Sequence, residues 1–202
     1  MKYLAIDTNA DLLVVLKNGS EKHVKRLIGS QMKHSLTLMP YIEEILEETK
    51  MQLSDLDFFA VVIGPGSFTG IRIGVATVKA LAFATGKKVL AVNSFDLLAY
   101  TDNAPEKAFC LVNANHDNYY CSSYLNGKVE LAPCFLNVEQ VVERSQGYSL
   151  CASEENLFEN QFTCDAVSGL FNAIENKLDQ LTDYNQIEPL YVKRSQAEEE
   201  LC

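Results

Sequence analysis

The chain has 202 residues, of which 48% are hydrophobic, and it carries 17 lysines and arginines against 27 aspartates and glutamates, a net charge of −10. This length and apolar fraction predict a folded protein of one domain or two small ones, and they exclude intrinsic disorder. Because an acidic surface repels phosphate backbones, the charge argues against tight nucleic-acid binding by this chain alone.

The chain shows no sign of export or of membrane insertion. Asp7 falls where a signal peptide needs an apolar run, and Lys79 interrupts the most apolar stretch. We therefore expect a cytoplasmic protein without membrane contact. The six cysteines all lie in the second half at irregular spacing and without a C-x-x-C. This pattern favours reduced, partly buried thiols over a disulfide framework or a zinc site.

The first half of the chain predicts three strands followed by alternating helices and strands. Asn18-Gly19 is a strong hairpin signal. Further on, apolar residues recur at steps of three and four while glutamates fill the opposite face, which is typical of an amphipathic helix. The expected elements are strands 3–9, 12–16 and 23–28, a helix 33–50, a strand 58–63, a helix from Ser67 or Thr69 to Gly86, a strand 89–92 and a short helix from residue 94.

The second half opens with the same pattern after a polar, proline-containing segment, 101–107, that we interpret as a linker. We therefore expect two lobes, 1–102 and 103–202. Residues 110–115 resemble residues 4–9, and the repeat of three strands suggests an internal duplication. The expected elements are strands 119–125 and 129–135 around an Asn126-Gly127 turn, a helix 138–146, a strand 148–152, helices 154–161 and 168–181, and a short strand 164–167.

The expected strand 58–63 runs into the glycine-rich sequence Gly-Pro-Gly-Ser-Phe-Thr-Gly-Ile-Arg-Ile-Gly, residues 64–74. Such a strand–turn–helix unit presents free N–H groups and a positive helix end, which suit an anion. The spacing matches neither the dinucleotide fingerprint nor the P-loop. A tight turn kept for packing explains the glycines equally well. As nucleotide-binding candidates the turn offers Gly66, Ser67 and Thr69.

The order of elements is similar to the two-lobe α/β fold of actin, sugar kinases and Hsp70 chaperones. In that fold a nucleotide lies between the lobes, and each lobe offers an aspartate on its first hairpin. The positional matches here are Asp7 and Asn113. An amide cannot act as a base or attract Mg²⁺ as a carboxylate does. The phosphate-binding site that this fold offers in its second lobe is therefore weakened here. Asp7 is either a ligand or the cap of its own hairpin turn.

The glycine-rich sequence resembles the hallmark of the TsaB (YeaZ) family, which serves tRNA threonylcarbamoyladenosine synthesis. Residues 4–8, 33–40 and 189–199 also fit that family, whereas Asn113 and Asn115 depart from it. The catalytic paralogue, TsaD, has a metal-binding His-x-x-x-His where this chain has Ser94 and Leu98. Neither side chain replaces imidazole as a metal ligand. The resemblance therefore implies an accessory subunit without catalytic or metal-binding residues, and it argues against a metallopeptidase.

The helix after the glycine turn carries Arg72 and Lys79 on one narrow stripe and is otherwise apolar or small. Because a helix on one sheet normally shows a wide polar face, a second apolar surface should cover it. That surface is either another helix of the same chain or another subunit. The resemblance implies that the first two helices pair with those of TsaD or of a second copy. The interface residues we expect are His34, Leu38, Gly70, Arg72, Gly74, Thr77, Val78 and Leu81.

The resemblance implies a complex with a TsaD-like catalytic subunit and a TsaE-like ATPase that modifies adenosine 37 of ANN-decoding tRNA. On its own the chain would form a homodimer, and it would meet tRNA only through the complex. It would bind no cofactor tightly, with ATP or ADP at most at the joint with its partner. The alternative is a stand-alone ATP-dependent small-molecule kinase of the same fold, which Asp7 and the glycine turn favour and Asn113 opposes.

Overall fold

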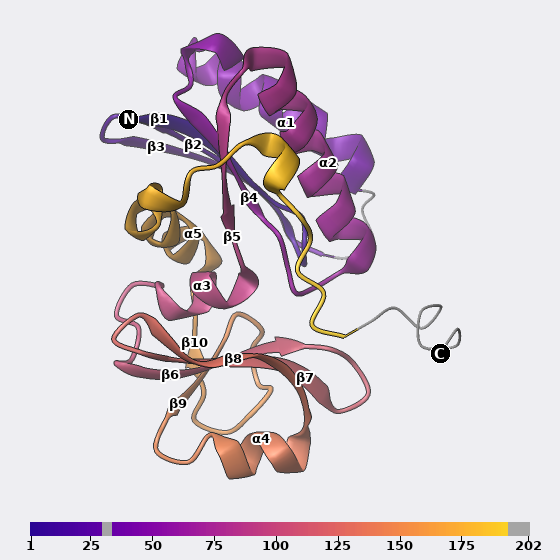
Figure 1. Ribbon diagram of the computed structural model, residues 1–202, viewed down its shortest axis with the longest axis vertical. Helices are drawn as coiled ribbons and strands as arrows, with labels where there is room; N and C mark the ends of the chain where they lie inside the picture. Colours follow the sequence, from indigo (N-terminus) through magenta and orange to yellow (C-terminus); the bar gives the residue numbers. More distant parts are fainter. Residues whose placement is uncertain (30–33, 194–202) are drawn as a thin grey trace. The chain divides into compact units, whose positions relative to one another are not determined.

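A computed structural model describes residues 1–29 and 34–193 (Figure 1). The chain forms two compact units. The first comprises Met1–Asn93 and Ala173–Pro189, and the second comprises Ser94–Asn172 and the described residues after Pro189. Each unit is built on its own five-stranded sheet.

The sheet of the first unit has the strand order β3-β2-β1-β4-β5. Its strands are β1 (Lys2–Asp7), β2 (Leu12–Asn18), β3 (Glu21–Leu27), β4 (Phe58–Val62) and β5 (Lys88–Val92). The first three are antiparallel, whereas β4 and β5 run parallel to β1. Every residue of β4 is buried, as expected for a parallel strand covered on both faces.

Helices α1 (His34–Thr49) and α2 (Phe68–Thr85) cover one face of this sheet (Figure 1). Their apolar periodicity explains the arrangement, because the residues at steps of three and four are the buried ones. Leu38, Ile42 and Ile45 of α1 and Val75 and Val78 of α2 enter the core formed by the strands. The helix ends at Gly86, which adopts the left-handed conformation at φ 66°.

The second unit repeats this order position for position, as β8-β7-β6-β9-β10. Its elements are α3 (Ser94–Ala99), β6 (Lys107–Asn113), β7 (Asn118–Leu125), β8 (Lys128–Asn137), α4 (Val138–Arg144), β9 (Ser149–Ala152), β10 (Phe162–Thr163) and α5 (Ala166–Asn176). One apolar cluster includes Phe95 of α3, and another includes Val141 of α4. The equal strand orders support the predicted duplication.

Most predicted elements are confirmed to within a few residues, and Lys33, the expected start of the first helix, lies outside the described residues. The helix predicted at 154–161 is wrong, because that stretch consists of turns and bends. Asn156 and Asn160 have φ of 60° and 58°, which a right-handed helix does not permit. The short strand lies at Phe162–Thr163 instead of 164–167, and α5 ends at Asn176, earlier than 181.

The two units do not divide at the single point expected near residue 102. Residues 173–189 return to the first unit, where Thr182 and Val89 exchange backbone hydrogen bonds of 2.9 Å each. Ile187 is buried in the core of that unit, and its carbonyl accepts a hydrogen bond of 3.0 Å from Lys79 Nζ. Residues 94–99, in turn, pack in a cluster with residues of the second sheet. The polar linker is therefore a loop within the second unit.

Of the described helices, α2 is the one that is long and apolar enough in composition to cross a membrane. Its apolar character has a second explanation in the fold. Ile71, Val75, Val78 and Ala82 pack against the sheet, and the segment around Ile187 covers part of the remaining surface through Lys79. These contacts account for the apolar residues on the sides of α2 that face the sheet and the returning segment.

The returning segment should contribute directly to the stability of the first unit. We expect Ile187→Ala to lower the free energy of unfolding by about 2–4 kcal/mol, because it leaves a cavity in the core. Ile28→Ala, at a side chain that is 73% exposed, makes the same chemical change and should stay within about 0.5 kcal/mol of wild type. Urea unfolding of both variants tests this, and equal losses would contradict the assignment of this segment to the core.

Candidate functional site at the end of strand β1

The glycine turn folds tightly around the end of β1. Ser67 is the N-cap of α2 and accepts a hydrogen bond of 3.2 Å from the Gly70 N–H, as its sequence position predicts. The Ser67 N–H donates to the carbonyl of Asn9 over 2.8 Å. A Cβ on Gly66 would lie 2.8 Å from the Asn9 Cβ, closer than real Cβ contacts allow. The turn therefore needs glycine at position 66 in order to contact its own chain.

The next two glycines make room for Thr8 in the same way. A Cβ on Gly70 would lie 1.9 Å from the Thr8 carbonyl oxygen, and one on Gly74 would lie 2.5 Å from Thr8 Oγ1. The buried Thr8 hydroxyl donates to the Gly70 carbonyl over 2.7 Å. The spacing of these glycines is thus explained by helix α2 lying directly on the end of β1, which favours the packing interpretation of the turn.

Asp7 ends β1 beside this contact. Its Oδ1 accepts a hydrogen bond of 2.8 Å from the Asn9 N–H, the geometry of an aspartate that caps its own turn. Burial raises the pKa of Asp7 to about 6, and the charge of Asp11 adds to this, whereas the Asn9 N–H and Arg26 act in the opposite direction. Perturbed carboxyl groups of this kind occur both at functional sites and in structural networks.

The second unit contains the same turn with an amide in place of the acid. Asn113 ends β6, and its Oδ1 accepts a hydrogen bond of 2.8 Å from the Asn115 N–H. Its amide nitrogen donates to Glu154 over 3.1 Å. The equal geometry at Asp7 and Asn113 shows that the turn itself does not require a carboxylate. A carboxylate at position 7 is therefore an additional property of the first unit.

The predicted interface residues are divided between the core and the surface. Gly70, Gly74, Leu38 and Val78 are buried in the first unit, so they cannot form the outer face of the helices. The expectation that a partner helix approaches over the two glycines needs correction, because Thr8 occupies that space. The remaining members are accessible: Arg72 is exposed, with its guanidinium 3.7 Å from the centroid of the Phe68 ring, and His34, Thr77 and Leu81 are half-buried.

Apart from Arg72, the outer face of these two helices consists of residues that the sequence reasoning missed. Leu36 and Met39 of α1 and Phe83 of α2 are exposed, at 69%, 43% and 70%. Ala76 and Ala80 lie exposed between Arg72 and Phe83 on α2. The steps of three and four from Arg72 could have identified this stripe, since Gly70 and Gly74 belong to the opposite, buried side. We call Leu36, Met39, Arg72, Ala76, Ala80 and Phe83 the outer helix face.

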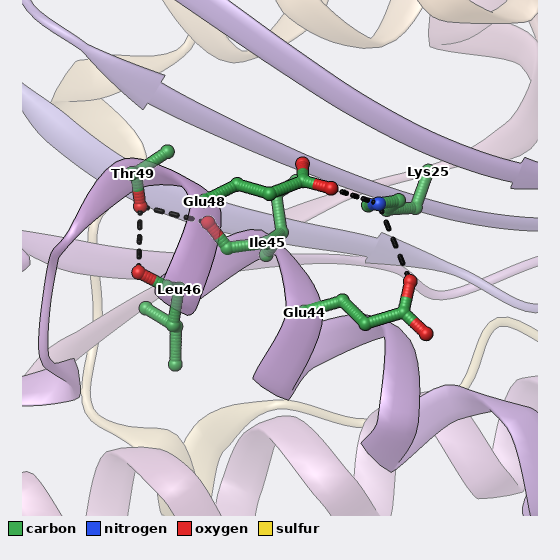
Figure 2. Close-up of polar contacts among 6 residues, drawn as sticks. All are labelled: Lys25, Glu44, Ile45, Leu46, Glu48 and Thr49. Atoms are coloured by element: carbon green, nitrogen blue, oxygen red, sulfur yellow. Dashed lines mark hydrogen bonds and ion pairs between the residues drawn. The ribbon is translucent and has the colours of Figure 1, made fainter.

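The second half of α1 is acidic on its surface and is fastened to the edge of the sheet. Figure 2 shows Lys25 of β3 between Glu44 and Glu48, at 3.3 Å and 2.5 Å from their carboxylate oxygens. The Thr49 hydroxyl donates to the carbonyls of Ile45 and Leu46, which closes the last turn of the helix (Figure 2). The acidic residues thus lie in the second half of α1, and the exposed apolar residues Leu36 and Met39 lie in its first half.

The structure also places Ser94 and Leu98, the two positions that the family resemblance singled out. Ser94 begins α3, and Leu98 is buried in the same helix, 3% exposed. Within residues 1–29 and 34–193, no group of three or more His, Cys, Asp or Glu side chains is arranged to hold a metal ion. The five described cysteines are free thiols, four of them buried, as the sequence predicts.

Comparison with known proteins agrees with these features. A family model described as TsaD, tRNA N6-adenosine threonylcarbamoyltransferase, matches residues 29–185. The "tRNA threonylcarbamoyladenosine biosynthesis protein TsaB" of Haemophilus influenzae is 29% identical over 131 residues, 62% of this chain and 55% of the relative. The protein of the same name from Bacillus subtilis is 36% identical over 100 residues, 49% of this chain and 44% of the relative. The matched region thus spans about half the length of these relatives.

A solved structure, YeaZ from Pseudomonas aeruginosa, is similar over 94% of this chain and 99% of its own, with a TM-score of 0.75 and 25% identity. The duplicated sheets and the glycine turn on β1 define an α/β protein of the actin-like class. Within that class, the chain belongs to the TsaD family of tRNA N6-adenosine threonylcarbamoyltransferases, on its TsaB (YeaZ) branch.

The contact between α2 and Thr8 can be tested with a double-mutant cycle. Gly74→Ala should destabilise the chain by about 1–3 kcal/mol, because its methyl group collides with the Thr8 hydroxyl. Thr8→Ala removes that obstacle, so the double variant should lose less stability than the two single losses added together. Gly70→Ala, which meets a backbone oxygen, should show no such rescue. Simple additivity in chemical denaturation would contradict the predicted collision.

The raised pKa of Asp7 predicts a pH-dependent cost to stability. Well below the ordinary pKa of 3.8 the carboxyl is neutral in both the folded and the unfolded state, so Asp7→Asn should change little there. As the pH rises, the unfolded chain releases the proton first, and above about pH 6 the buried charge should cost the wild type up to about 3 kcal/mol. Asp7→Asn should therefore be the more stable protein at pH 7.5.

The control for this measurement is Asp179→Asn, which removes the same charge from an exposed position of the first unit. Urea unfolding between pH 4 and pH 8 compares the three proteins. A stability gain that does not change with pH, or one shared by the control, would contradict the assignment to Asp7.

Proposed function

We propose that this chain is a non-catalytic accessory subunit in the synthesis of threonylcarbamoyladenosine at position 37 of ANN-decoding tRNAs, and that it binds and activates a TsaD-like transferase. The names of its relatives support the pathway. Its net charge of −10 supports contact with tRNA through the complex. The complex would include a TsaE-like ATPase, and the chain would act in the cytoplasm.

The observation that supports the non-catalytic role is that the glycine turn is filled by its own chain. The glycines that could cradle a phosphate are in contact with Thr8 and Asn9 of the same chain. At the equivalent turn of the second unit, Asn113 replaces the carboxylate that would hold Mg²⁺. Ser94 and Leu98 supply no imidazole for a metal. These features support a chain that kept the fold and lost the reactive groups.

The outer helix face is the surface that we assign to the partner. Its members are apolar or small apart from Arg72, and large side chains such as Leu36 and Phe83 are exposed in the isolated chain. Exposed apolar side chains on two helices that contact each other are typical of protein interfaces. In the absence of the transferase, the same face would pair two copies of this chain. A nucleotide would bind, if at all, at the joint with the partner.

The alternative is a stand-alone ATP-dependent small-molecule kinase, which the partly buried carboxylate of Asp7 and the glycine turn favour. The two functions differ in what the chain does by itself. A kinase hydrolyses or transfers the γ-phosphate of ATP alone, whereas an accessory subunit changes the turnover of its partner.

Charged substitutions on the outer helix face test the proposal. We expect Leu36→Glu and Ala80→Glu each to weaken binding to the TsaD-like subunit at least about tenfold, because a buried, unpaired carboxylate disrupts an apolar interface. Val142→Glu is the matched control, since Val142 is 58% exposed on α4 of the second unit. Circular dichroism checks that all three variants stay folded.

Binding is measured by titration calorimetry, and function by mass spectrometry of the modified nucleoside in total tRNA from cells that carry each variant. Folded face variants that bind the partner as well as Val142→Glu does would remove the docking assignment. ATP turnover by the purified chain without its partner would instead favour the kinase.

A further inference from the structure

Two cysteines face each other on neighbouring strands of the second unit. Cys121 of β7 and Cys134 of β8 are directly opposed in the antiparallel register, between the pairs Tyr120–Phe135 and Ser123–Leu131. Opposed residues of antiparallel strands point to the same face of a sheet. Both side chains accordingly belong to one apolar cluster, together with Leu136. The proposed function does not involve this pair, and neither cysteine belongs to the glycine turn.

The register brings the two thiols within reach of a covalent bond. Opposed residues in antiparallel strands have Cα atoms about 4.5–5.5 Å apart, which lies within the roughly 4.4–6.8 Å that disulfides span. Among the described strands, β8 lies at the edge of its sheet and pairs with β7. The register also shifts between Cys121 and Ser123, and such an irregularity bends and twists a strand.

The surroundings of the pair differ in access and in charge. Cys121 is fully buried, whereas Cys134 is partly exposed. Burial raises the pKa of both thiols, and the positive charge of Arg144 on α4 opposes this rise at each of them. Arg144 therefore offsets part of the effect of burial, and the pKa of both thiols stays above its ordinary value. This arrangement offers one sulfur to a reagent from solvent and keeps the second directly behind it.

We propose that Cys121 and Cys134 form a site of reversible oxidation, in which a hydroperoxide converts the two thiols into a disulfide between β7 and β8. The Cys134 thiolate attacks the peroxide, the O–O bond breaks, and a sulfenic acid and hydroxide are formed. The Cys121 thiolate then attacks the Cys134 sulfur, the S–S bond forms and the S–O bond breaks. Overall, two thiols and one hydrogen peroxide give one disulfide and two waters.

The other described cysteines serve as internal controls. Cys110 and Cys151 are opposed across β6 and β9, and Cys164 lies in the same cluster. All three are buried, at 5% exposure or less. The Cys164 thiol contacts the Leu98 carbonyl at 3.5 Å inside that cluster. Burial shields these sulfurs from a reagent in solvent. Hydrogen bonding with Cys164 nevertheless lowers the pKa of Cys151, whereas the pKa of Cys134 is raised, so the comparison tests access against acidity.

The experiment treats the reduced full-length protein with one equivalent of hydrogen peroxide, alkylates the remaining thiols and digests without reductant. Trypsin places Cys110 and Cys121 on residues 108–128 and Cys134 on residues 129–144. We expect these two peptides to appear linked, two hydrogens lighter than their sum, and to separate again with dithiothreitol. The linked species should be absent from Cys121→Ser and from Cys134→Ser, but present in Cys110→Ser and Cys164→Ser.

Three results would overturn the proposal. The first is the recovery of Cys121 and Cys134 as separate alkylated peptides in the folded wild type. The second is persistence of the link in Cys121→Ser, which would assign it to Cys110. The third is equally rapid loss of Cys151 and Cys164, because oxidation would then follow unfolding and not the geometry of the pair. Circular dichroism before and after treatment confirms that the reacting protein is folded.

Discussion

The contact between the end of β1 and the first turns of α2 positions the other features of the first unit. The Thr8 hydroxyl donates to the Gly70 carbonyl, and the absent side chains at Gly70 and Gly74 let the helix lie directly on the strand. With α2 fixed in this way, one side of the helix is committed to the core and the other to the surface. The outer helix face is a consequence of that close approach.

The internal duplication permits a comparison within one molecule. Both sheets have the same strand order, and both first strands end in a turn capped by the side chain of their last residue. Only the first copy retains an acid there, and its burial raises its pKa. A carboxylate that destabilises its own fold, as Asp7 does, is retained either because it serves a function or because it was inherited from an ancestor. The amide in the second copy shows that an acceptor oxygen without a charge is enough to cap this turn.

The sequence predicted the elements well wherever local signals were strong. The Asn-Gly hairpins, the Ser67 cap, the Gly86 stop and the buried strands are all local features, and each is confirmed. The helix expected at 154–161 failed because two asparagines in left-handed conformations override a permissive composition.

For the candidate site, the glycine turn could be located from the sequence, but its contact with Thr8 could not be predicted. Thr8 and Gly70 are far apart in the sequence, and periodicity alone does not tell which side of an apolar helix meets a strand. For the same reason the outer helix face was partly misassigned. The return of residues 173–189 to the first unit depends on contacts such as that of Thr182 with Val89, which no local pattern announces.

That return has a consequence for how the protein is made. A ribosome completes residues 1–93 early, yet the core they form still lacks Ile187, and β5 still lacks its contact with Thr182. During translation the core of the first unit stays incomplete until residues 94–172 and the returning segment have been synthesised. The earliest segment to be synthesised is therefore the last to have its core completed.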